Sequence, residues 1–237
     1  MNPARIAELL QPFLEEERLS SAQLSHISTY INILLRWNAR INLTAIRDPE
    51  EIVTRHFGES LFAARHLFPS VSSAHVQTTA LAVPQCSSVS PVVKASKLAD
   101  LGTGAGFPGI PMKLWAPHVA LTLIESSHKK ATFLREVVRA LTLTNVDIQN
   151  ARAQSLPPRT YDVVTLRAVE KFEAVVAVAA SLVADDGRLA LLIGSAQVPQ
   201  LQTALPFQSI SALLPIPSSS SKVLAVVEKP RISKQEW

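Results

Sequence analysis

Apolar side chains recur every three or four residues near the start of the chain, which is the spacing of amphipathic helices. One such face consists of Leu24, Ile27, Ile31, Leu34 and Leu35. Asp48 can cap a second helix, because Pro49 suits a first helical position and the acidic Glu50 and Glu51 favour its positive end. Its inner stripe would be Val53, Phe57, Leu61 and Ala64. We therefore predict a helical subdomain over residues 1–68.

Residues 69–96 interrupt this pattern. The segment is rich in serine, contains Pro84 and Pro91, and shows no sustained period of apolar positions. Segments of this composition usually connect structured parts of a chain. We predict a flexible connection here, followed by a second domain over residues 97–237.

That second domain alternates short apolar runs with helical faces. Five runs have the length and composition of buried strands, and they are Lys97–Leu101, Ala120–Glu125, Val146–Ala151, Tyr161–Leu166 and Leu189–Gly194. Helical faces separate them at Leu134–Leu141 and Phe172–Val183. Such alternation predicts an α/β fold with a mostly parallel sheet and helices on both faces. Phe207–Leu213 and Lys222–Glu228 could add a hairpin at one edge, where antiparallel strands are common.

Composition excludes several classes of protein. Of the 237 residues, 47% are hydrophobic and 18% charged, which is enough apolar material for a sizeable core. The longest uncharged apolar run, Ala174–Ala184, falls short of the roughly 20 residues that span a bilayer. Neither a secretory signal nor a cysteine framework is visible, since Cys86 is the only cysteine. We therefore expect a cytoplasmic protein that binds no membrane and no metal.

The charge distribution permits an anionic partner without demanding one. The net charge is +4, while residues 1–69 alone are slightly acidic. Only 5% of residues are aromatic, which argues against a platform that stacks the bases of single-stranded RNA.

The strongest chemical signal is the run Asp100–Gly109, which reads DLGTGAGFPG and lies between a predicted strand and a predicted helix. A phosphate-binding P-loop is excluded because no Lys-Ser or Lys-Thr follows Gly109. The dinucleotide pattern fails because Phe107 stands where its third glycine belongs. The remaining acid-x-Gly-x-Gly-x-Gly pattern resembles the first motif of S-adenosylmethionine-dependent methyltransferases. Glu125, 23 residues beyond Gly102, ends the next strand and could accept hydrogen bonds from a ribose.

Further segments resemble, in order, the bacterial RsmG (GidB) family, which methylates N7 of a guanine in small-subunit ribosomal RNA. They are Trp37-Asn38, Ile41–Ile46, Asp48–Glu51, Arg55–Phe57, Ser60-Leu61, Gly102–Pro111, Lys129-Lys130, Phe133–Arg135, Leu143–Val146, Asp162–Val164 and Arg167-Ala168. The resemblance covers roughly residues 20–68 and 97–195. It implies a Rossmann-like methyltransferase fold with a seven-stranded, mostly parallel sheet, and S-adenosylmethionine as the cofactor.

The glycine motif and the resemblance together imply roles for individual residues. The predicted cofactor contacts are Asp100, Gly102, Thr103, Gly104, Gly106, Phe107, Glu125, Ala153, Gln154 and Arg167. The predicted RNA contacts are Lys129, Lys130, Arg135 and Arg152, with Arg139 and Lys113 as further members of the same basic stripe. Such a stripe is also typical of an ordinary solvated helix face. Arg167 is the predicted catalytic residue, because it would end the fourth strand where cofactor and guanine meet.

The chain departs from the family at two positions. Ile193-Gly194 stands where the family commonly has Lys-Gly after the fifth strand, and Lys222 is the only basic residue near the start of the last strand. The missing lysine favours one alternative, an RNA-binding ribosome assembly factor without catalysis. The other alternative is an NAD(P)-dependent α/β oxidoreductase, which the glycine spacing disfavours.

Methylation of guanine N7 requires no general base, because the lone pair on N7 attacks the methyl group directly. Catalysis would come mainly from holding nucleophile and methyl group in line without water. Arg167 could contact guanine O6 or a phosphate, since a bond to N7 itself would block the attack. The expected partner is ribosomal RNA of the small subunit, free or within a ribosomal particle, and we expect the protein to act as a monomer.

Overall fold

The computed structural model describes residues 1–69, 96–167, 171–206 and 208–229. Residues 70–95 of the predicted connection lie outside the described residues, and so does Cys86. The described helices include none that is both long enough and apolar enough to cross a membrane.

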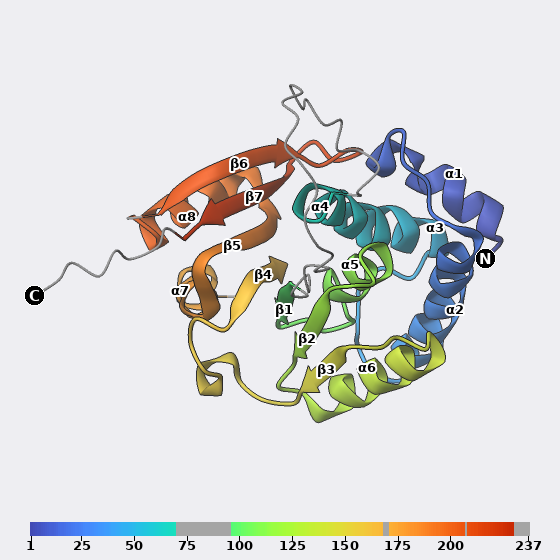
Figure 1. The fold of residues 1–237 in the computed structure, drawn as a ribbon. Helices are drawn as coiled ribbons and strands as arrows, with labels where there is room; N and C mark the ends of the chain where they lie inside the picture. Colours follow the sequence, from blue (N-terminus) through green and yellow to red (C-terminus); the bar gives the residue numbers. More distant parts are fainter. Residues whose placement is uncertain (70–95, 168–170, 207, 230–237) are drawn as a thin grey trace, which may run out of the picture.

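The first 67 residues form a succession of helices, shown in blue to teal in Figure 1. They are α1 (Pro3–Leu14), α2 (Ser21–Asn38), α3 (Pro49–Ile52), the π-helical η1 (Val53–Gly58) and α4 (Glu59–Leu67). Asp48 caps α3 as predicted, and its carboxylate accepts a hydrogen bond from the Glu51 N–H at 2.8 Å. The predicted inner stripe from Val53 to Ala64 is fully buried. The widening of this helix into a π-helical turn at η1 was not predicted. Such a deviation is frequent near functional sites.

A seven-stranded sheet forms the centre of the remaining chain (Figure 1). Its strands are β1 (Lys97–Leu101), β2 (Ala120–Ile124), β3 (Val146–Gln149), β4 (Tyr161–Arg167), β5 (Val183–Gly194), β6 (Ser209–Pro215) and β7 (Lys222–Glu228). The order is β3-β2-β1-β4-β5-β7-β6. β1 to β5 pair in parallel, whereas β7 pairs antiparallel with both β5 and β6. The predicted fold class is therefore confirmed, including the antiparallel hairpin at one edge.

Helices cover both faces of the sheet, as predicted. They are α5 (Gly109–Trp115), α6 (His128–Ala140), α7 (Phe172–Leu182) and α8 (Val198–Ala204), with short 3₁₀ turns at η3 (Ala153–Ser155) and η4 (Ser195–Gln197). The expected boundary between α7 and β5 was wrong, because the strand begins at Val183 and not at Leu189. Val183 already pairs with Tyr161, and an irregularity then separates this pair from the regular ladder that begins at Arg188.

Alternate residues of each strand point to opposite faces, so the sheet separates two hydrophobic clusters. Leu98 and Val163 face the cluster that contains the N-terminal helices, α5 and α6. Ala99 and Val164 face the cluster that contains α7 and α8. The N-terminal helices therefore bury their apolar faces together with the sheet and share its core. The division of the chain at residues 68 and 97 stays a prediction.

Polar contacts attach the N-terminal helices to the sheet domain as well. Glu136 on α6 accepts a 2.8 Å hydrogen bond from the Trp37 indole N–H and also pairs with Arg36. The Trp115 indole N–H donates to the Phe68 carbonyl at 2.9 Å. These bonds attach α2 to α6, and the end of α4 to the end of α5.

Candidate functional site

The order of the strands reverses between β1 and β4, which are neighbours although five elements, α5, β2, α6, β3 and η3, separate them in sequence. In open α/β sheets, ligands bind beyond the carboxyl ends of the strands at such a switch point. Asp100 on β1 pairs in register with Thr165 on β4, and Arg167 is the last residue of β4. The glycine loop and Arg167 therefore meet at the edge where a ligand is expected.

Left-handed backbone conformations shape the glycine loop. Gly102, Gly104 and Gly106 have φ angles of 66°, 56° and 87°, a region that other residues rarely adopt. A side chain at Gly106 would also collide with the Tyr30 hydroxyl and the Ile110 side chain. Glycine is thus required at this turn both for its backbone angle and for the close approach of α2.

Asp100 holds this loop from inside the protein. Its buried carboxylate accepts hydrogen bonds from the Thr103 hydroxyl at 2.5 Å and from the Gly109 N–H at 2.9 Å. Burial raises the pKa of Asp100 to about 6, an effect that these hydrogen bonds partly oppose. Asp100 acts here as a support for the loop and does not line the cavity described next.

A cavity of about 540 Å³ lies between the glycine loop, Arg167 and the N-terminal helices. Its lining comes from the segment 43–59, the glycine loop, α6, the strands β4, β5 and β7, and the 3₁₀ turn η4. The predicted site residues on it are Gly102, Thr103, Gly104, Phe107, Lys130 and Arg167.

Other predicted contacts lie outside this cavity. Glu125 is largely buried, and its carboxylate accepts hydrogen bonds from the Gly104 N–H at 3.0 Å and the Ser127 N–H at 2.7 Å. It therefore braces the glycine loop, and a carboxylate has further lone pairs with which to accept other donors. Ala153 is buried in η3, whereas Gln154 beside it is exposed.

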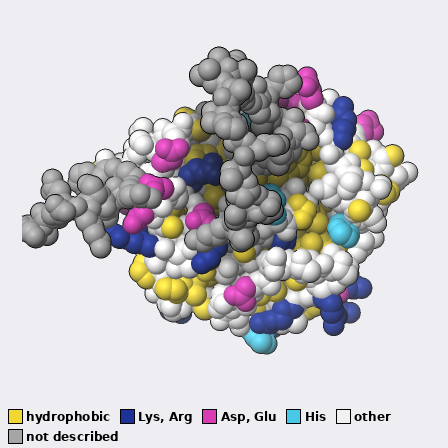
Figure 2. Space-filling model, in the orientation of Figure 1, with side chains coloured by type: hydrophobic (Ala, Val, Ile, Leu, Met, Phe, Trp, Pro, Cys, Tyr) yellow, Lys and Arg dark blue, Asp and Glu magenta, His cyan; other side chains and the backbone are white. Residues whose placement is uncertain are grey.

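The predicted RNA contacts are mainly exposed, and Lys129, Arg135 and Arg152 point to solvent. Figure 2 shows dark blue side chains at the lower edge of this face, where Figure 1 places α6. The inclusion of Lys113 in this stripe was wrong. Its side chain is buried, and its ammonium donates to the Pro117 and Val119 carbonyls at 2.7 and 2.5 Å.

Two cations share one carboxylate inside the cavity. Glu59 at the start of α4 accepts a 2.7 Å hydrogen bond from the Lys222 ammonium and forms a 3.1 Å ion pair with Arg167. Arg167 also donates to the Arg55 carbonyl at 2.6 Å, while its buried Nη1 atom has no hydrogen-bond partner in the described part of the chain. Burial lowers the pKa of the Arg167 guanidinium, and the charge of Glu59 opposes this effect.

Lys222 also bears on the missing lysine at position 193. It pairs with Gly194 across β5 and β7, and both residues line the cavity beside Ile193. The neighbouring strand thus supplies a positive charge close to the position where the sequence lacks one.

His56 forms the opposite wall of the cavity. Its ring stacks on Phe107 with 4.7 Å between centroids, and its Nε2 atom lies 2.8 Å from the Thr44 hydroxyl. Burial lowers the pKa of His56 to about 3, with further contributions from the charges of Arg167, Lys222 and Arg55. The imidazole is therefore neutral at physiological pH.

Sequence reasoning missed Thr44, His56 and Glu59 as members of the site. A signal for Thr44 exists in Asn38, whose buried amide binds the Leu43 and Thr44 N–H groups and the Thr44 carbonyl at 2.9 to 3.0 Å. The Trp-Asn signature thus fixes the loop that brings Thr44 to the cavity.

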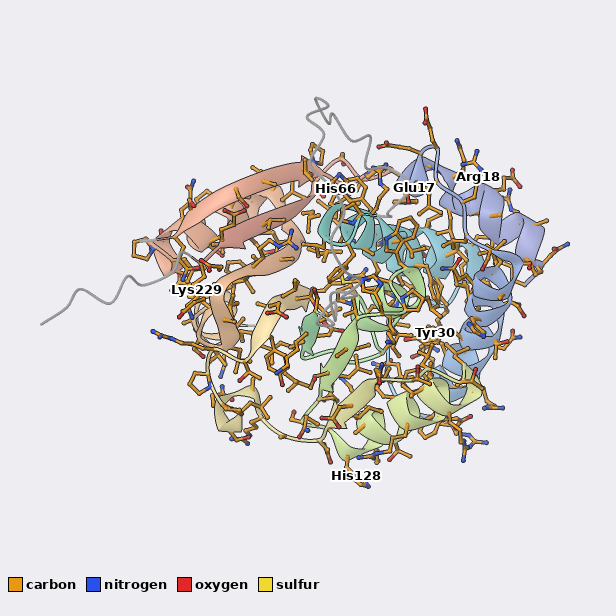
Figure 3. All side chains as sticks on the ribbon, in the orientation of Figure 1. Glu17, Arg18, Tyr30, His66, His128 and Lys229 are labelled. Atoms are coloured by element: carbon orange, nitrogen blue, oxygen red, sulfur yellow. The ribbon has the colours of Figure 1, made fainter. Side chains whose placement is uncertain are left out.

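Tyr30 connects α2 directly to the glycine loop. Its ring stacks on Phe107 at 5.3 Å between centroids, and its hydroxyl donates to the Ala105 carbonyl. Figure 3 shows Tyr30 on the inner side of α2, toward the centre of the molecule. Among the described residues, no three His, Cys, Asp or Glu side chains group closely enough to hold a metal ion.

Comparison with known proteins identifies relatives along most of the chain. Residues 23–80 and 74–213 match the GidB family, described as rRNA small subunit methyltransferase G. A protein named ribosomal RNA small subunit methyltransferase G from Xylella fastidiosa (strain 9a5c) is 35% identical over 205 residues, which is 85% of this chain and 84% of that protein. One with the same name from Xanthomonas euvesicatoria pv. vesicatoria (strain 85-10) is 35% identical over 199 residues, or 82% of each chain.

Solved structures with low sequence identity share the fold. A ribosomal protein L11 methylase from Lactobacillus delbrueckii subsp. bulgaricus has a TM-score of 0.50 and 18% identity, covering 60% of this chain and 73% of its own. The [4+2]-cyclase SpnF has a TM-score of 0.51 and 13% identity, covering 58% of this chain and 76% of its own. Because a methylase and a cyclase both share this architecture, the fold alone does not determine the reaction.

Proposed function

Since this chain belongs to the ribosomal RNA small subunit methyltransferase G family, we propose that it methylates N7 of a guanine in small-subunit (16S) ribosomal RNA. The family predicted from the sequence is confirmed by these relatives. Membership of a methyltransferase family favours this function over an assembly factor without catalysis and over an NAD(P)-dependent oxidoreductase. The cofactor of the reaction is S-adenosylmethionine.

The glycine loop fits this cofactor. A side chain built at Gly102 would meet no atom within 4 Å, so the loop there faces open space. At Gly104 the nearest atom, the Gly102 carbonyl oxygen, would be 3.8 Å away. Backbone at such positions can approach a ligand closely. We therefore assign Gly102, Thr103 and Gly104 to the amino-acid end of the cofactor, with Glu125 behind them in reach of a ribose.

The reaction needs positioning more than proton transfer. When bound, S-adenosylmethionine supplies an electrophilic methyl group that the guanine N7 lone pair can attack. This protein would contribute the walls that exclude water and align the reactants. Neutral His56 stacked on Phe107 gives an uncharged wall, which suits a flat base and a cationic methyl donor better than an imidazolium would.

The observation that carries the proposal is the position of Arg167 in the cavity. Its buried Nη1 atom has no hydrogen-bond partner among the residues that the structure describes, and a buried donor in this state is costly unless a ligand binds it. A guanine O6 atom or an RNA phosphate would accept this hydrogen bond. We therefore propose that Arg167, on the cavity wall, donates to an electron-rich group of the substrate.

The outer face of α6 would guide the RNA toward this cavity. Lys130 lies on the cavity wall, and Lys129 and Arg135 continue the positive charge along the exposed side of the same helix. Such a row can follow phosphates. The finer partner assignments remain part of the proposal: the substrate is the RNA in the cytoplasm, either free or within a ribosomal particle, and the protein acts as a monomer.

A transfer assay tests the proposed function. Purified protein is incubated with S-adenosylmethionine carrying a labelled methyl group and with unmethylated small-subunit RNA or subunits, and 7-methylguanine is measured after digestion. Wild type should transfer the label, and Arg167→Ala should lower the rate by about 100-fold. Arg18→Ala, an exposed residue on the outside of the molecule (Figure 3), is the matched control and should retain wild-type activity. RNA binding without transfer would favour the assembly factor, and stabilisation by NADPH alone would favour the oxidoreductase.

A further inference from the structure

Glu59 is the acidic side chain on the cavity wall, and it is the least exposed member of its charged cluster. Its side chain is 4% exposed, compared with 11% for Arg167 and 27% for Lys222. A carboxylate buried to this degree is costly unless cations compensate it. Here two cations do so, from two strands that lie on opposite sides of β5.

Both cations depend on Glu59 for their position. Glu59 lies 2.7 Å from the Lys222 ammonium and 3.1 Å from the Arg167 guanidinium, so it prevents two like charges from facing each other unscreened. Its backbone also belongs to the helix that continues η1, whose Arg55 carbonyl accepts the other bond of Arg167. The N-terminal helices therefore hold Arg167, which lines the cavity, at two points.

We infer that Glu59 is a positioning residue of the methyl-transfer site, which orients Arg167 and supplies the negative charge that a sulfonium cofactor needs beside two cations. This inference rests on the proposed function. Glu59 acts through Arg167 on the substrate and through its charge on the cofactor. Without it, the cavity would carry two uncompensated cations next to a positively charged methyl donor.

A double-mutant cycle tests the first part of the inference. The proteins compared are wild type, Glu59→Gln, Arg167→Ala and the double variant, and the quantity measured is kcat/KM for the RNA at S-adenosylmethionine concentrations that saturate every variant. If Glu59 acts through Arg167, Glu59→Gln should lower kcat/KM at least tenfold in wild type and less than twofold when Arg167 is already alanine. Equal losses in both backgrounds would overturn the inference.

Binding tests the second part without relying on turnover. S-adenosylmethionine carries a sulfonium charge, whereas S-adenosylhomocysteine has a neutral sulfur atom. The dissociation constant of S-adenosylmethionine divided by that of S-adenosylhomocysteine, both measured by calorimetry, should be about tenfold higher in Glu59→Gln than in wild type. The reason is that the variant lacks a charge that attracts the sulfonium group. An unchanged ratio would overturn the inference.

Glu136→Gln is the matched control for stability. Glu136 also joins an N-terminal helix to the sheet domain through an ion pair, with Arg36, but it lies outside the cavity. This variant should leave the binding ratio unchanged even where thermal stability falls. If wild type bound both cofactor forms but methylated no RNA, the proposed function would fail while the binding ratio still tested Glu59. If wild type bound neither, both would be overturned.

Discussion

His56 gives the sharpest prediction about the folded state, because its buried imidazole should make the protein sensitive to acid. Its folded pKa is about 3, far below the ordinary value of 6.5, chiefly because burial disfavours the charged ring. The unfolded chain therefore takes up the proton first as the pH falls. Stability from neutral His56 is fully present above pH 6.5 and is lost progressively toward pH 3.

The size of the effect follows from the two pKa values. Proton linkage between pH 7 and pH 5 gives a loss of about 2 kcal/mol in the free energy of unfolding. His56→Phe removes the titrating group, and a phenyl ring can still stack on Phe107. The free energy of unfolding of wild type should fall by about 2 kcal/mol more than that of His56→Phe over this interval.

Urea unfolding followed by circular dichroism at pH 7, 6 and 5 measures this difference. Titration of Asp100 occurs in both proteins, so it cancels from the comparison. His128→Phe changes an exposed histidine on α6 (Figure 3) and should follow wild type. If wild type and His56→Phe lost stability in parallel, the burial of a neutral His56 would be refuted.

Three further predictions concern the loop and the basic helix. Gly106→Ala should lower the free energy of unfolding by at least about 2 kcal/mol in urea titrations, because the residue needs a left-handed backbone and has no room for a side chain. Asp100→Asn should gain stability relative to wild type by up to about 3 kcal/mol as the pH rises from 4 to 7. Because the folded pKa of Asp100 is raised to about 6, its contribution to the stability of wild type is present at low pH and is lost as the pH rises through 6. Lys129→Ala and Arg135→Ala should each reduce the slope of log affinity for RNA against log salt by somewhat under 1, measured by filter binding, while the cofactor dissociation constant stays unchanged.

The fold could be predicted from the sequence because strands covered on both faces leave a plain signal. β1 and β7 were predicted with their observed bounds, β7 because it is a nearly continuous apolar run and β1 because the glycine loop follows it directly. The start of β5 was not predicted with its observed bound. Asp185, Asp186 and Gly187 interrupt the apolar pattern there, at a point where the strand is irregular. Turn-forming residues inside a strand are read as a loop when only local pattern is available.

The glycine loop could be predicted as well. The spacing of its glycines marks the positions that need a left-handed backbone, and few classes of ligand are bound by a loop with this pattern. The opposite wall of the cavity could not, because Thr44, His56 and Glu59 reach it only when the N-terminal helices pack beside the sheet. Local periodicity shows which face of a helix is apolar but not what that face meets. Glu59 did carry a hint, since it directly precedes the buried residues Ser60 and Leu61, where an unpaired charge would be costly.

Lys113 shows that local pattern also fails to indicate whether a charged side chain is buried. A lysine near a basic stripe was interpreted as part of it, yet its apolar stem lies in the core and its ammonium reaches two backbone carbonyls. Sequence proximity to other charges therefore did not indicate exposure.

The central claim is that this protein methylates N7 of a guanine in small-subunit ribosomal RNA. The most direct measurement maps 7-methylguanine along that RNA, by chemical cleavage at the modified base, in cells with the gene, without it, and with the Arg167→Ala form restored. One modified guanine should disappear on deletion, return with the wild-type gene and stay absent or nearly so with Arg167→Ala. An identical map in all of these cells would contradict the claim.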